Sequence, residues 1–375
     1  MNRILPMVGK NIDTRNNTRM KLLFICHNLT GGGAERVCSD VANGLAQRGH
    51  EVLIMTDLSS TITYEPLPQV KLIPLPKHCG RVKTRLVAYR QLCQVLREEK
   101  PDVVISILYL YASLAKLASM RTIGCPVIAS DHNAFERPSS GKMRFRSKID
   151  KFWTNYLLDG LTVLTEADSK YLNGRFKHTY VMPNPLGLKP LAEVPEKERV
   201  VLAVGRLNEW HCKGFDLLIK AWGGLGAAYP EWHLRIVGHG DKDTLDYLKG
   251  LSSGCRNIEF LPYTRSIQTE YQKADIFVLS SRYEGFGLVL TEAMSQGCAC
   301  IACDYKGRQA EIVTDGKDGL LCLVDDGEAL AQRLRMLLDD EPLRRKLQRN
   351  AIQDVDRFSI AHIAERWERV LQAYC

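Results

Sequence analysis

Two acidic residues in the second half of the chain, Glu284 and Glu292, stand eight positions apart in the segment from Arg282 to Gln296. Glycines on both sides of Phe286 allow main-chain N–H groups to face an anion or sugar hydroxyls. Each carboxylate can accept hydrogen bonds from a vicinal pair of hydroxyls. Helix capping by Glu284, or a helix dipole at Glu292, explains either acid singly but not the combined pattern. A polar sugar and a ribose are therefore suitable partners for this segment.

Two cations bracket a turn earlier in the same half. An apolar run at 199–204 leads into Gly205-Arg206-Leu207, and Lys213 follows after a short polar stretch. Arg206 offers a planar fork for phosphate oxygens and Lys213 a mobile point charge, so together they can neutralise a diphosphate as its negative charge develops. Taken alone, the motif is explained equally well by surface cations that flank a loop.

Three consecutive glycines, Gly31 to Gly33, follow the apolar run at 21–26 and precede a helical pattern at 34–48. Such a run lets the backbone approach a phosphate closely at the positive end of a helix dipole. A tight turn explains the glycines equally well, because they lack the spacing of a dinucleotide fingerprint or of a Walker loop.

The elements that must position these loops alternate regularly along the chain. Short β-branched runs separated by helix-length segments predict parallel sheets wrapped by helices. The expected strands are 21–26, 51–56, 70–75, 102–107, 126–130 and 161–164, and then 199–204, 233–238, 257–261, 275–280, 299–302 and 320–324. A proline-rich stretch at 183–195 separates the two series and indicates a linker. We predict two doubly wound domains, 1–185 and 186–357, with ligands beyond the carboxyl ends of the strands.

The last segment, 358–375, is amphipathic. Ser359 is a suitable N-cap for a helix in which apolar residues recur at helical spacing. These residues are Ile360, Ile363, Trp367, Val370 and Leu371. We expect this helix to return to the first domain.

Composition limits the class of protein. The chain has 375 residues, 45% hydrophobic and 25% charged, as expected for two soluble globular domains. No apolar run approaches the ~18 to 20 residues that span a bilayer, and the first twenty residues do not resemble a secretory signal. Twelve cysteines without regular spacing favour a reducing cytoplasm. Cys298, Cys300 and Cys303 suggest a metal cluster, but their apolar run favours a buried strand.

Positive charge is concentrated in the first half. The net charge is +8, and residues 1–185 carry 26 Lys and Arg against 15 Asp and Glu. Such a surface attracts nucleic acid, anionic lipid headgroups and phosphorylated acceptors alike. The segment 141–153 interleaves five cations with Met, Phe and Trp, and Arg81, Lys83 and Arg85 lie upstream. This mixture suits an anionic bilayer surface, or equally a solvated helix face.

The stretch from Arg282 to Met294 closely resembles the signature of the retaining glycosyltransferases of family 4, in which seven residues separate two glutamates. The glycine loop from Gly31 to Arg36 is similar to that family's N-terminal loop, and Gly205-Arg206-Leu207 with Lys213-Gly214 to its diphosphate-binding pair. Ser130 to Asn133 is similar to its histidine-bearing loop. The resemblance covers nearly the whole chain. It implies the GT-B fold, an α/β architecture of two Rossmann-like doubly wound parallel-sheet domains facing across a cleft.

The resemblance also implies roles for individual residues. Arg206 and Lys213 would bind the donor diphosphate, and Glu292 the ribose hydroxyls. His132 and Glu284 are the catalytic candidates, although a lone histidine is more often a structural hydrogen-bonding residue. The other donor-binding residues that it implies are Gly32, Gly33, Phe286, Gly287 and Leu288.

Two loops depart from the family's pattern. The gap between Arg206 and Lys213 is longer than expected, so that Lys213 would reach the phosphates by a different path. The loop from Asp304 to Gln309 carries Lys306 and Arg308, which would either contact the acceptor or be solvated. These departures bear on the acceptor more than on the donor.

The implied reaction moves a hexosyl or N-acetylhexosaminyl group from a nucleotide-diphosphate sugar, with UDP-sugar favoured, to a glycan hydroxyl with retention of configuration. We expect no cofactor and no metal, because Arg206, Lys213 and helix N-termini can offset the charge of the leaving group. The expected acceptor is a lipid-linked saccharide, such as one on polyprenyl diphosphate, in cell-surface polysaccharide assembly. We expect a cytoplasmic protein, peripheral on the inner face of the cell membrane.

Two other classes remain open from sequence. A nucleotide-sugar epimerase or phosphorylase can use the same tandem fold, because the fold does not decide the reaction. A basic nucleic-acid-binding module would account for the charge, but no recognisable motif with stacking aromatics supports it, and we expect no nucleic-acid partner.

Overall fold

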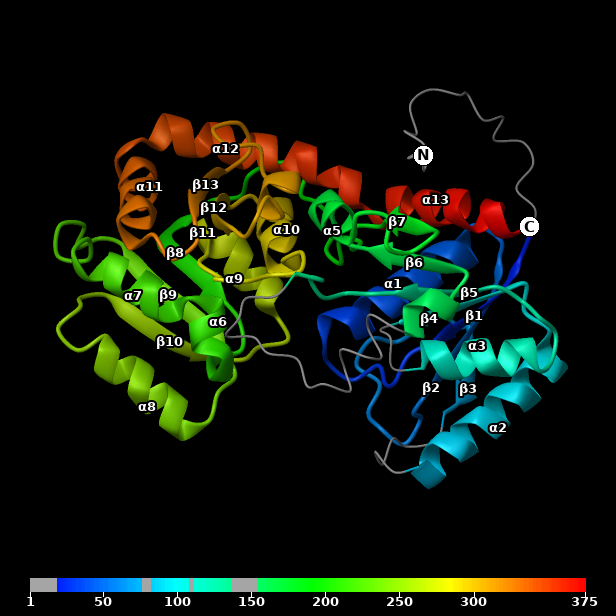
Figure 1. The fold of residues 1–375 in the computed structure, drawn as a ribbon. Helices are drawn as coiled ribbons and strands as arrows, with labels where there is room; N and C mark the ends of the chain where they lie inside the picture. Colours follow the sequence, from blue (N-terminus) through cyan, green and yellow to red (C-terminus); the bar gives the residue numbers. More distant parts are fainter. Residues whose placement is uncertain (1–18, 76–81, 108–110, 137–153) are drawn as a thin grey trace.

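The computed structural model describes residues 19–75, 82–107, 111–136 and 154–375. Two sheets, each surrounded by helices, form two lobes that lie side by side (Figure 1). All paired strands in both sheets run parallel. This is the two-lobed doubly wound architecture that the alternating sequence pattern predicts.

The sheet of the first lobe has seven strands in the order β3-β2-β1-β4-β5-β6-β7. Its strands are β1 (Lys21–Ile25), β2 (Glu51–Thr56), β3 (Lys71–Pro74), β4 (Val103–Ile107), β5 (Val127–Ser130), β6 (Gly160–Val163) and β7 (Thr179–Val181). The helices of this lobe are α1 (Gly33–Gln47), α2 (Val82–Glu99), α3 (Ala112–Met120), η1 (Thr154–Leu157) and α5 (Glu166–Leu172). The apolar runs predict every strand except β7, which has three half-buried residues at the edge of the sheet.

The sheet of the second lobe has six strands in the order β10-β9-β8-β11-β12-β13. Its strands are β8 (Glu198–Val204), β9 (His233–Gly238), β10 (Ile258–Pro262), β11 (Ala274–Leu279), β12 (Ala299–Asp304) and β13 (Leu320–Leu323). Its helices are η2 (Leu207–Glu209), α6 (Trp210–Lys213), α7 (Phe215–Gly223), α8 (Lys242–Leu251), α9 (Ile267–Lys273), α10 (Leu288–Ser295), η3 (Gln309–Glu311), α11 (Gly327–Asp339) and α12 (Glu341–Asp354). The sequence predicts all six strands to within two residues.

The strand orders explain where the loops of interest lie. In each sheet the order reverses beside the first strand, between β1 and β4 in one lobe and between β8 and β11 in the other. Loops at such reversals diverge and leave room for a ligand beyond the carboxyl ends of the strands. The glycine loop follows β1, the Arg206 loop follows β8 and the Glu284 loop follows β11.

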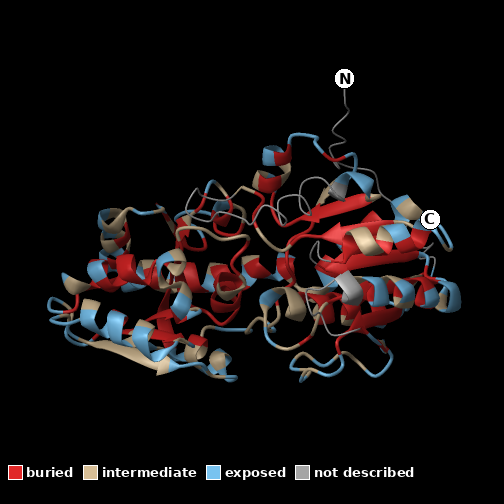
Figure 2. Cartoon of the chain, turned by 60° about the horizontal axis from the view of Figure 1, so that its bottom comes forward, coloured by how far each residue is buried: buried red, intermediate tan, exposed pale blue. Residues whose placement is uncertain are grey.

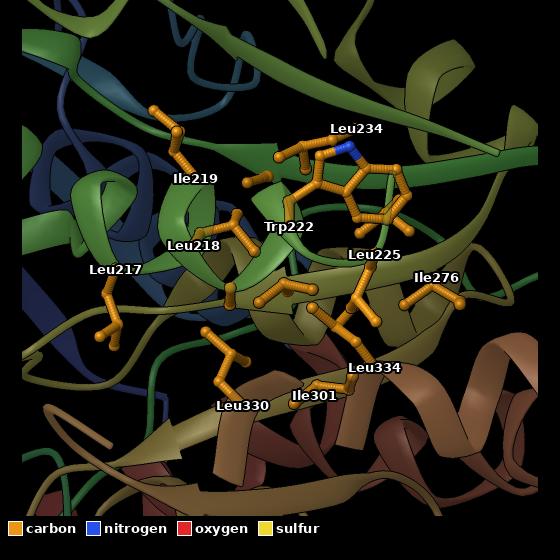
Figure 3. Close-up of a cluster of buried hydrophobic side chains, with 14 of the residues drawn as sticks. Leu217, Leu218, Ile219, Trp222, Leu225, Leu234, Ile276, Ile301, Leu330 and Leu334 are labelled. Carbon is orange, nitrogen blue, oxygen red and sulfur yellow. The ribbon is translucent and has the colours of Figure 1, made fainter. Parts of the chain in front are cut away.

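Each sheet lies inside its lobe, with buried strands between more exposed helices (Figure 2). In the second lobe α7 packs through Trp222, which is fully buried in a cluster that also holds side chains from the sheet and from α11 (Figure 3). The Trp222 indole N–H donates a 3.0 Å hydrogen bond to the carbonyl of Arg256, so the ring brings no unpaired donor into the core.

Cysteine residues in β12 belong to the core. Cys300 lies in the cluster on one face of the sheet, and Cys303 lies in the cluster on the other face. Cys298, just before the strand, is also fully buried. The buried-strand interpretation is confirmed, and no three His, Cys, Asp or Glu side chains in the described part of the chain are grouped to hold a metal ion.

The chain ends by crossing from the second lobe to the first through η4 (Val355–Phe358), α13 (Ile360–Leu371) and η5 (Gln372–Tyr374) (Figure 1). The apolar face of α13 joins the core of the first lobe, where Trp367 is 2% exposed. A Cβ atom at Gly44 of α1 would lie 2.7 Å from Ile360, so the two helices are closely packed. Ser359 occupies the N-cap position, but its hydroxyl contacts His362 and does not cap the backbone.

Ion pairs also join the lobes directly. The Arg308 guanidinium donates a 2.7 Å hydrogen bond to Asp168 of α5, and both side chains are almost fully buried. Glu311 accepts the backbone N–H groups of Glu166 and Ala167, each at 2.8 Å, at the start of α5. Lys306 pairs with Glu136. The expectation that Arg308 contacts an acceptor or is solvated is therefore wrong, because its buried side chain joins the lobes, whereas Lys306 is 52% exposed.

Candidate active site

The loop after β11 carries Glu284, whose carboxylate meets Lys213 from the neighbouring strand's loop. The Lys213 ammonium lies 2.5 Å from Glu284 Oε1, and the Ser281 hydroxyl donates to the same oxygen at 3.0 Å. Both charged side chains are at most 17% exposed. Burial alone would lower the pKa of Lys213, but the Glu284 carboxylate outweighs it and the pKa is raised. Lys213 is therefore a cation at neutral pH.

Residues between Arg206 and Lys213 coil into two short helices, η2 and α6, which accommodate the unusually long gap. The main chain then turns at Gly214, whose φ of 66° lies in the left-handed region. A Cβ atom there would lie 1.9 Å from the carbonyl oxygen of Ser280, so only glycine fits at this turn. Lys213 is in this way held beside the β11 loop.

Arg206 lies apart from this group. Its side chain is 75% exposed and pairs with Glu209, 3.1 Å away, one turn further along. The structure thus brings Lys213 to Glu284 but leaves the second cation of the predicted diphosphate pair at the surface.

Arg282, at the start of the glutamate segment, anchors the loop. Its guanidinium forms a bidentate pair with Asp216 of α7, at 2.6 and 2.8 Å, and also pairs with Asp325. Its backbone N–H donates to the carbonyl of Cys212 at 2.9 Å. These contacts fix the β11 loop against the β8 loop and thereby set the distance between Lys213 and Glu284.

Glu292 lies inside α10 and is 5% exposed. The Tyr271 hydroxyl of α9 donates to one carboxylate oxygen at 3.1 Å, and Arg36 of the first lobe donates to the other at 2.5 Å. Burial raises the pKa of Glu292, while the charge of Arg36 and these hydrogen bonds oppose the rise. The carboxylate is therefore held between the two lobes with both oxygens oriented.

The glycine loop of the first lobe approaches α10 of the second. A Cβ atom at Gly33 would lie 3.0 Å from the Leu288 side chain. A Cβ atom at Gly32 would lie 2.0 Å from the carboxylate of Glu35. The structure therefore brings the glycine loop and Leu288 together.

His132 follows β5 of the first lobe, and its main chain packs against the β11 loop of the second lobe. Its Nδ1 lies 2.9 Å from the side-chain oxygen of Asn184, and its Nε2 lies 3.2 Å from the Ser130 hydroxyl. A Cβ atom at Gly285 would lie 3.2 Å from the His132 carbonyl oxygen, so the loops touch. Burial lowers the pKa of His132, against the Asn184 hydrogen bond and the charge of Asp131, which favours a neutral imidazole at neutral pH.

Two other predicted donor-binding residues, Phe286 and Gly287, offer a ligand main-chain groups and no side chain. The Phe286 ring is 3% exposed and stacks edge-on against Phe358, with ring centroids 5.4 Å apart. Its side chain therefore belongs to the core, and only its main chain can face a ligand. Gly287 has a φ of 99° and stands at the N-cap of α10, where the first N–H groups of the helix point outward.

Sequence reasoning missed four residues that orient the predicted ones, namely Arg36, Tyr271, Asn184 and Ser281. Arg36 contacts Glu292 across 256 positions, and Asn184 contacts His132 across 52. Helical or strand periodicity carries no signal for partners so distant. Ser281 is three residues from Glu284, and this spacing at a strand end is the one local signal that was available.

The side chains described above can bind a phosphate and hydroxyl groups. A buried cation beside one carboxylate, a second carboxylate held between the lobes, a neutral imidazole and the N-terminus of α10 all lie on segments that follow the carboxyl ends of β1, β5, β8 and β11. Cationic and N–H groups of this kind stabilise a phosphate, and carboxylates accept hydroxyl protons.

Family models match both lobes of the chain. The first lobe matches glycosyltransferase family 4 over residues 31–188, and the second matches glycosyl transferases group 1 over residues 189–354. An N-acetyl-D-galactosaminyltransferase of Campylobacter jejuni is 30% identical over 365 residues, which cover 94% of this chain and 98% of the relative. The chain belongs to this family of GT-B glycosyltransferases. Membership makes it a glycosyltransferase and does not support the epimerase, phosphorylase or nucleic-acid-binding alternatives.

A further relative is also a glycosyltransferase, and solved structures share the fold of this chain. The amylovoran biosynthesis glycosyltransferase AmsD of Erwinia amylovora is 27% identical, covering 94% of this chain and 99% of AmsD. HepE of Anabaena, solved with UDP and glucose, superposes with a TM-score of 0.75 at 18% identity, covering 95% of this chain and all of HepE. Sucrose-phosphate synthase of Thermosynechococcus elongatus gives a TM-score of 0.78 at 20% identity, covering 95% of this chain and 99% of that one. These likenesses establish the GT-B fold.

Proposed function

We propose that the protein transfers a hexosyl or N-acetylhexosaminyl group from a UDP-sugar to a hydroxyl of a lipid-linked glycan, with retention of anomeric configuration. The observation that carries the proposal is a set of three contacts: Lys213 pairs with Glu284, Glu292 pairs with Arg36 of the other lobe, and the loop of Glu284 packs against the main chain of His132. The crystal structure of HepE in complex with UDP and glucose supports a uridine donor.

The proposed roles follow from charge and position. Lys213 offsets the negative charge that develops on the departing diphosphate, with Arg206 joining it from the surface. Glu292 accepts the ribose hydroxyls, and the main chain at Phe286, Gly287 and Leu288 lies along the sugar, opposite Gly32 and Gly33. Glu284 accepts sugar hydroxyls, and neutral His132 orients the sugar at the reacting carbon.

Bonds change at one carbon in the proposed reaction. The bond from the anomeric carbon to the diphosphate oxygen breaks, and a bond from that carbon to the acceptor oxygen forms on the same face. The acceptor proton passes to the departing phosphate oxygen, so no side chain needs to remove it. Closure of the two lobes over the donor would exclude water, which limits hydrolysis of the donor.

Donor binding provides the first test. Thermal shift with UDP, GDP and ADP is expected to give the largest stabilisation with UDP. Glu292→Ala is expected to weaken UDP binding by about tenfold or more, because a charged acceptor of two hydroxyls is lost. Isothermal titration calorimetry measures the change, with Glu328→Ala of α11 as a control outside the site. Equal UDP affinity in the Glu292 variant and the wild type would contradict the ribose role.

The proposed acceptor places the protein at the cytoplasmic face of the membrane, as a peripheral protein. The Campylobacter jejuni relative is named for an acceptor linked to PP-undecaprenol, and a second relative from the same organism is named for diphospho-undecaprenol. No helix in the described ranges is long and apolar enough to cross a membrane. The basic segment 141–153 and Arg81 lie outside what the structure describes, Lys83 lies in the first turn of α2, and Arg85 is half-buried.

Membrane association has its own test. Co-sedimentation with phosphatidylglycerol vesicles is expected at low salt and is expected to fall as salt rises, because surface electrostatics are screened over about 10 Å at 0.1 M ionic strength. Vesicles of phosphatidylcholine alone serve as the control. A protein that ignores anionic vesicles and glycosylates only soluble sugars would refute the lipid-linked acceptor.

A further inference from the structure

Arg36 of α1 stands where the first lobe, the second lobe and the chain between them meet. Its guanidinium pairs with Glu292 of α10 at 2.5 Å, and its Nε lies 3.7 Å from Asp40 on its own helix. A Cβ atom at Gly187, between the last strand of one lobe and the first of the other, would lie 2.1 to 2.3 Å from three atoms of this guanidinium. The Arg36 side chain is therefore packed against the connecting segment while it contacts the opposite lobe.

Glu292 depends on this contact. Its side chain is 7% exposed, and its side-chain hydrogen bonds within the described residues come from Arg36 and Tyr271, one to each oxygen. A buried carboxylate that loses its cation carries a large desolvation cost. Two oxygens offer about four acceptor sites, so each oxygen keeps a site for one hydroxyl of a vicinal pair.

We propose that Arg36 is a positioning residue for the donor: by pairing with Glu292 across the lobes, it holds that carboxylate in the orientation that faces the donor's vicinal hydroxyls. Donor affinity then depends on contact between the lobes, since separating α1 from α10 removes the cation from Glu292. The inference deepens the proposed function and rests on the assignment of Glu292 to the ribose.

The pH dependence of donor binding follows from the groups that face Glu292. These are Arg36 and Asp40 of α1, Tyr271 of α9, and Tyr64. Burial raises the pKa of Glu292 and Arg36 lowers it, so removal of Arg36 raises that pKa further. Binding that requires the ionised form is present above this pKa and is lost as pH falls through it. Without Arg36 the acid limb of the binding profile therefore moves to higher pH.

Asp40 also titrates near Glu292, so its effect on the pH dependence of donor binding needs a separate control. Burial raises its pKa and the charge of Arg36 opposes the rise, which leaves the pKa at about 6. Asp40 therefore also titrates further toward neutral pH when Arg36 is removed. Asp40→Asn removes this group while retaining Arg36 and Glu292, so its profile separates the two contributions.

Gly187 supplies an independent way to displace Arg36. Its φ lies outside the left-handed region, so alanine is compatible with the backbone there. The added methyl group would occupy the space of the guanidinium and force it away from Glu292. In the double variant Arg36→Ala/Gly187→Ala the methyl group meets no guanidinium, and its effect on binding should disappear.

Calorimetric titration with UDP from about pH 5 to about pH 8 tests the proposal. We expect Arg36→Ala and Gly187→Ala each to weaken UDP binding by about tenfold near pH 6 and to move the acid limb upward. We expect the double variant to match Arg36→Ala. Arg369→Ala, which removes an exposed ion pair with Glu365 on α13, should bind like the wild type. Circular dichroism melts verify that each variant is folded.

The outcomes separate this inference from the proposed function. Wild-type affinity and an unmoved acid limb in Arg36→Ala, together with weak binding in Glu292→Ala, would overturn the positioning role alone. Additive losses in the double variant would also overturn it, because they would show that Gly187 acts apart from Arg36. Unchanged binding in Glu292→Ala would remove the ribose assignment, and a wild type that binds none of UDP, GDP and ADP would remove both proposals.

Discussion

Replacement of Lys213 by alanine is expected to lower the rate of sugar transfer about 100- to 1000-fold, the usual loss when one preorganised charge partner of a transition state is removed. Lys213 is 17% exposed, and its raised pKa keeps it cationic at neutral pH. A cation held in a mostly dry site acts on the diphosphate more strongly than the exposed Arg206 can. Steady-state kinetics with UDP-sugar and acceptor measure the loss.

Loss of structure must be distinguished from loss of chemistry in this variant. Lys213→Ala leaves the Glu284 carboxylate, which is 15% exposed, without its cation. Lys213→Ala/Glu284→Gln removes that buried charge, so we expect it to recover stability without recovering the rate. Lys220→Ala on α7 removes an exposed lysine of the same lobe and should retain full activity. A Lys213→Ala enzyme with a near wild-type rate would contradict the diphosphate role.

Replacement of Arg308 by methionine is expected to destabilise the protein by about 3–5 kcal/mol, the typical cost of breaking a buried ion pair by removing one partner. Arg308 is 0% exposed and Asp168 1%, and the pair joins the two lobes. The lone Asp168 carboxylate would keep the backbone N–H of Phe135 and the Thr165 hydroxyl but would lose its cation. Urea denaturation followed by circular dichroism measures the effect.

A matched control for this variant lies two residues away. Lys306 pairs with Glu136 across the same junction, but its side chain is 52% exposed, so Lys306→Met should cost less than about 1 kcal/mol. Arg308→Met/Asp168→Asn removes both charges and should recover part of the lost stability. The buried pair would be unimportant if Arg308→Met proved no less stable than Lys306→Met.

The sheets could be predicted from the sequence because their strands are nearly continuous apolar runs, such as the buried β4 and β11. The exception, β7, is a half-buried edge strand whose pairing to β6 leaves little trace in three residues. The positions of the loops followed from the same periodicity, since a parallel doubly wound sheet places its functional loops at one edge.

Local sequence patterns could not predict which side chains pair with one another in the site. Nothing near Arg308 in sequence indicates that Asp168, 140 positions away, neutralises it in the core. The same holds for Arg36 and Glu292, which belong to different lobes. Conversely, the residue type of Arg206 suits phosphate binding, but its side chain is exposed and is not held in position for a phosphate. Such contacts depend on how the lobes pack, which periodicity does not encode.

A crystal structure of the protein with bound UDP-sugar tests the central claim most directly. The account predicts the diphosphate within hydrogen-bonding distance of the Lys213 ammonium, the ribose hydroxyls on the Glu292 carboxylate and the sugar between Gly285 and His132. A nucleotide bound elsewhere, or one at the lobe junction that leaves both Lys213 and Glu292 without a contact, would contradict it.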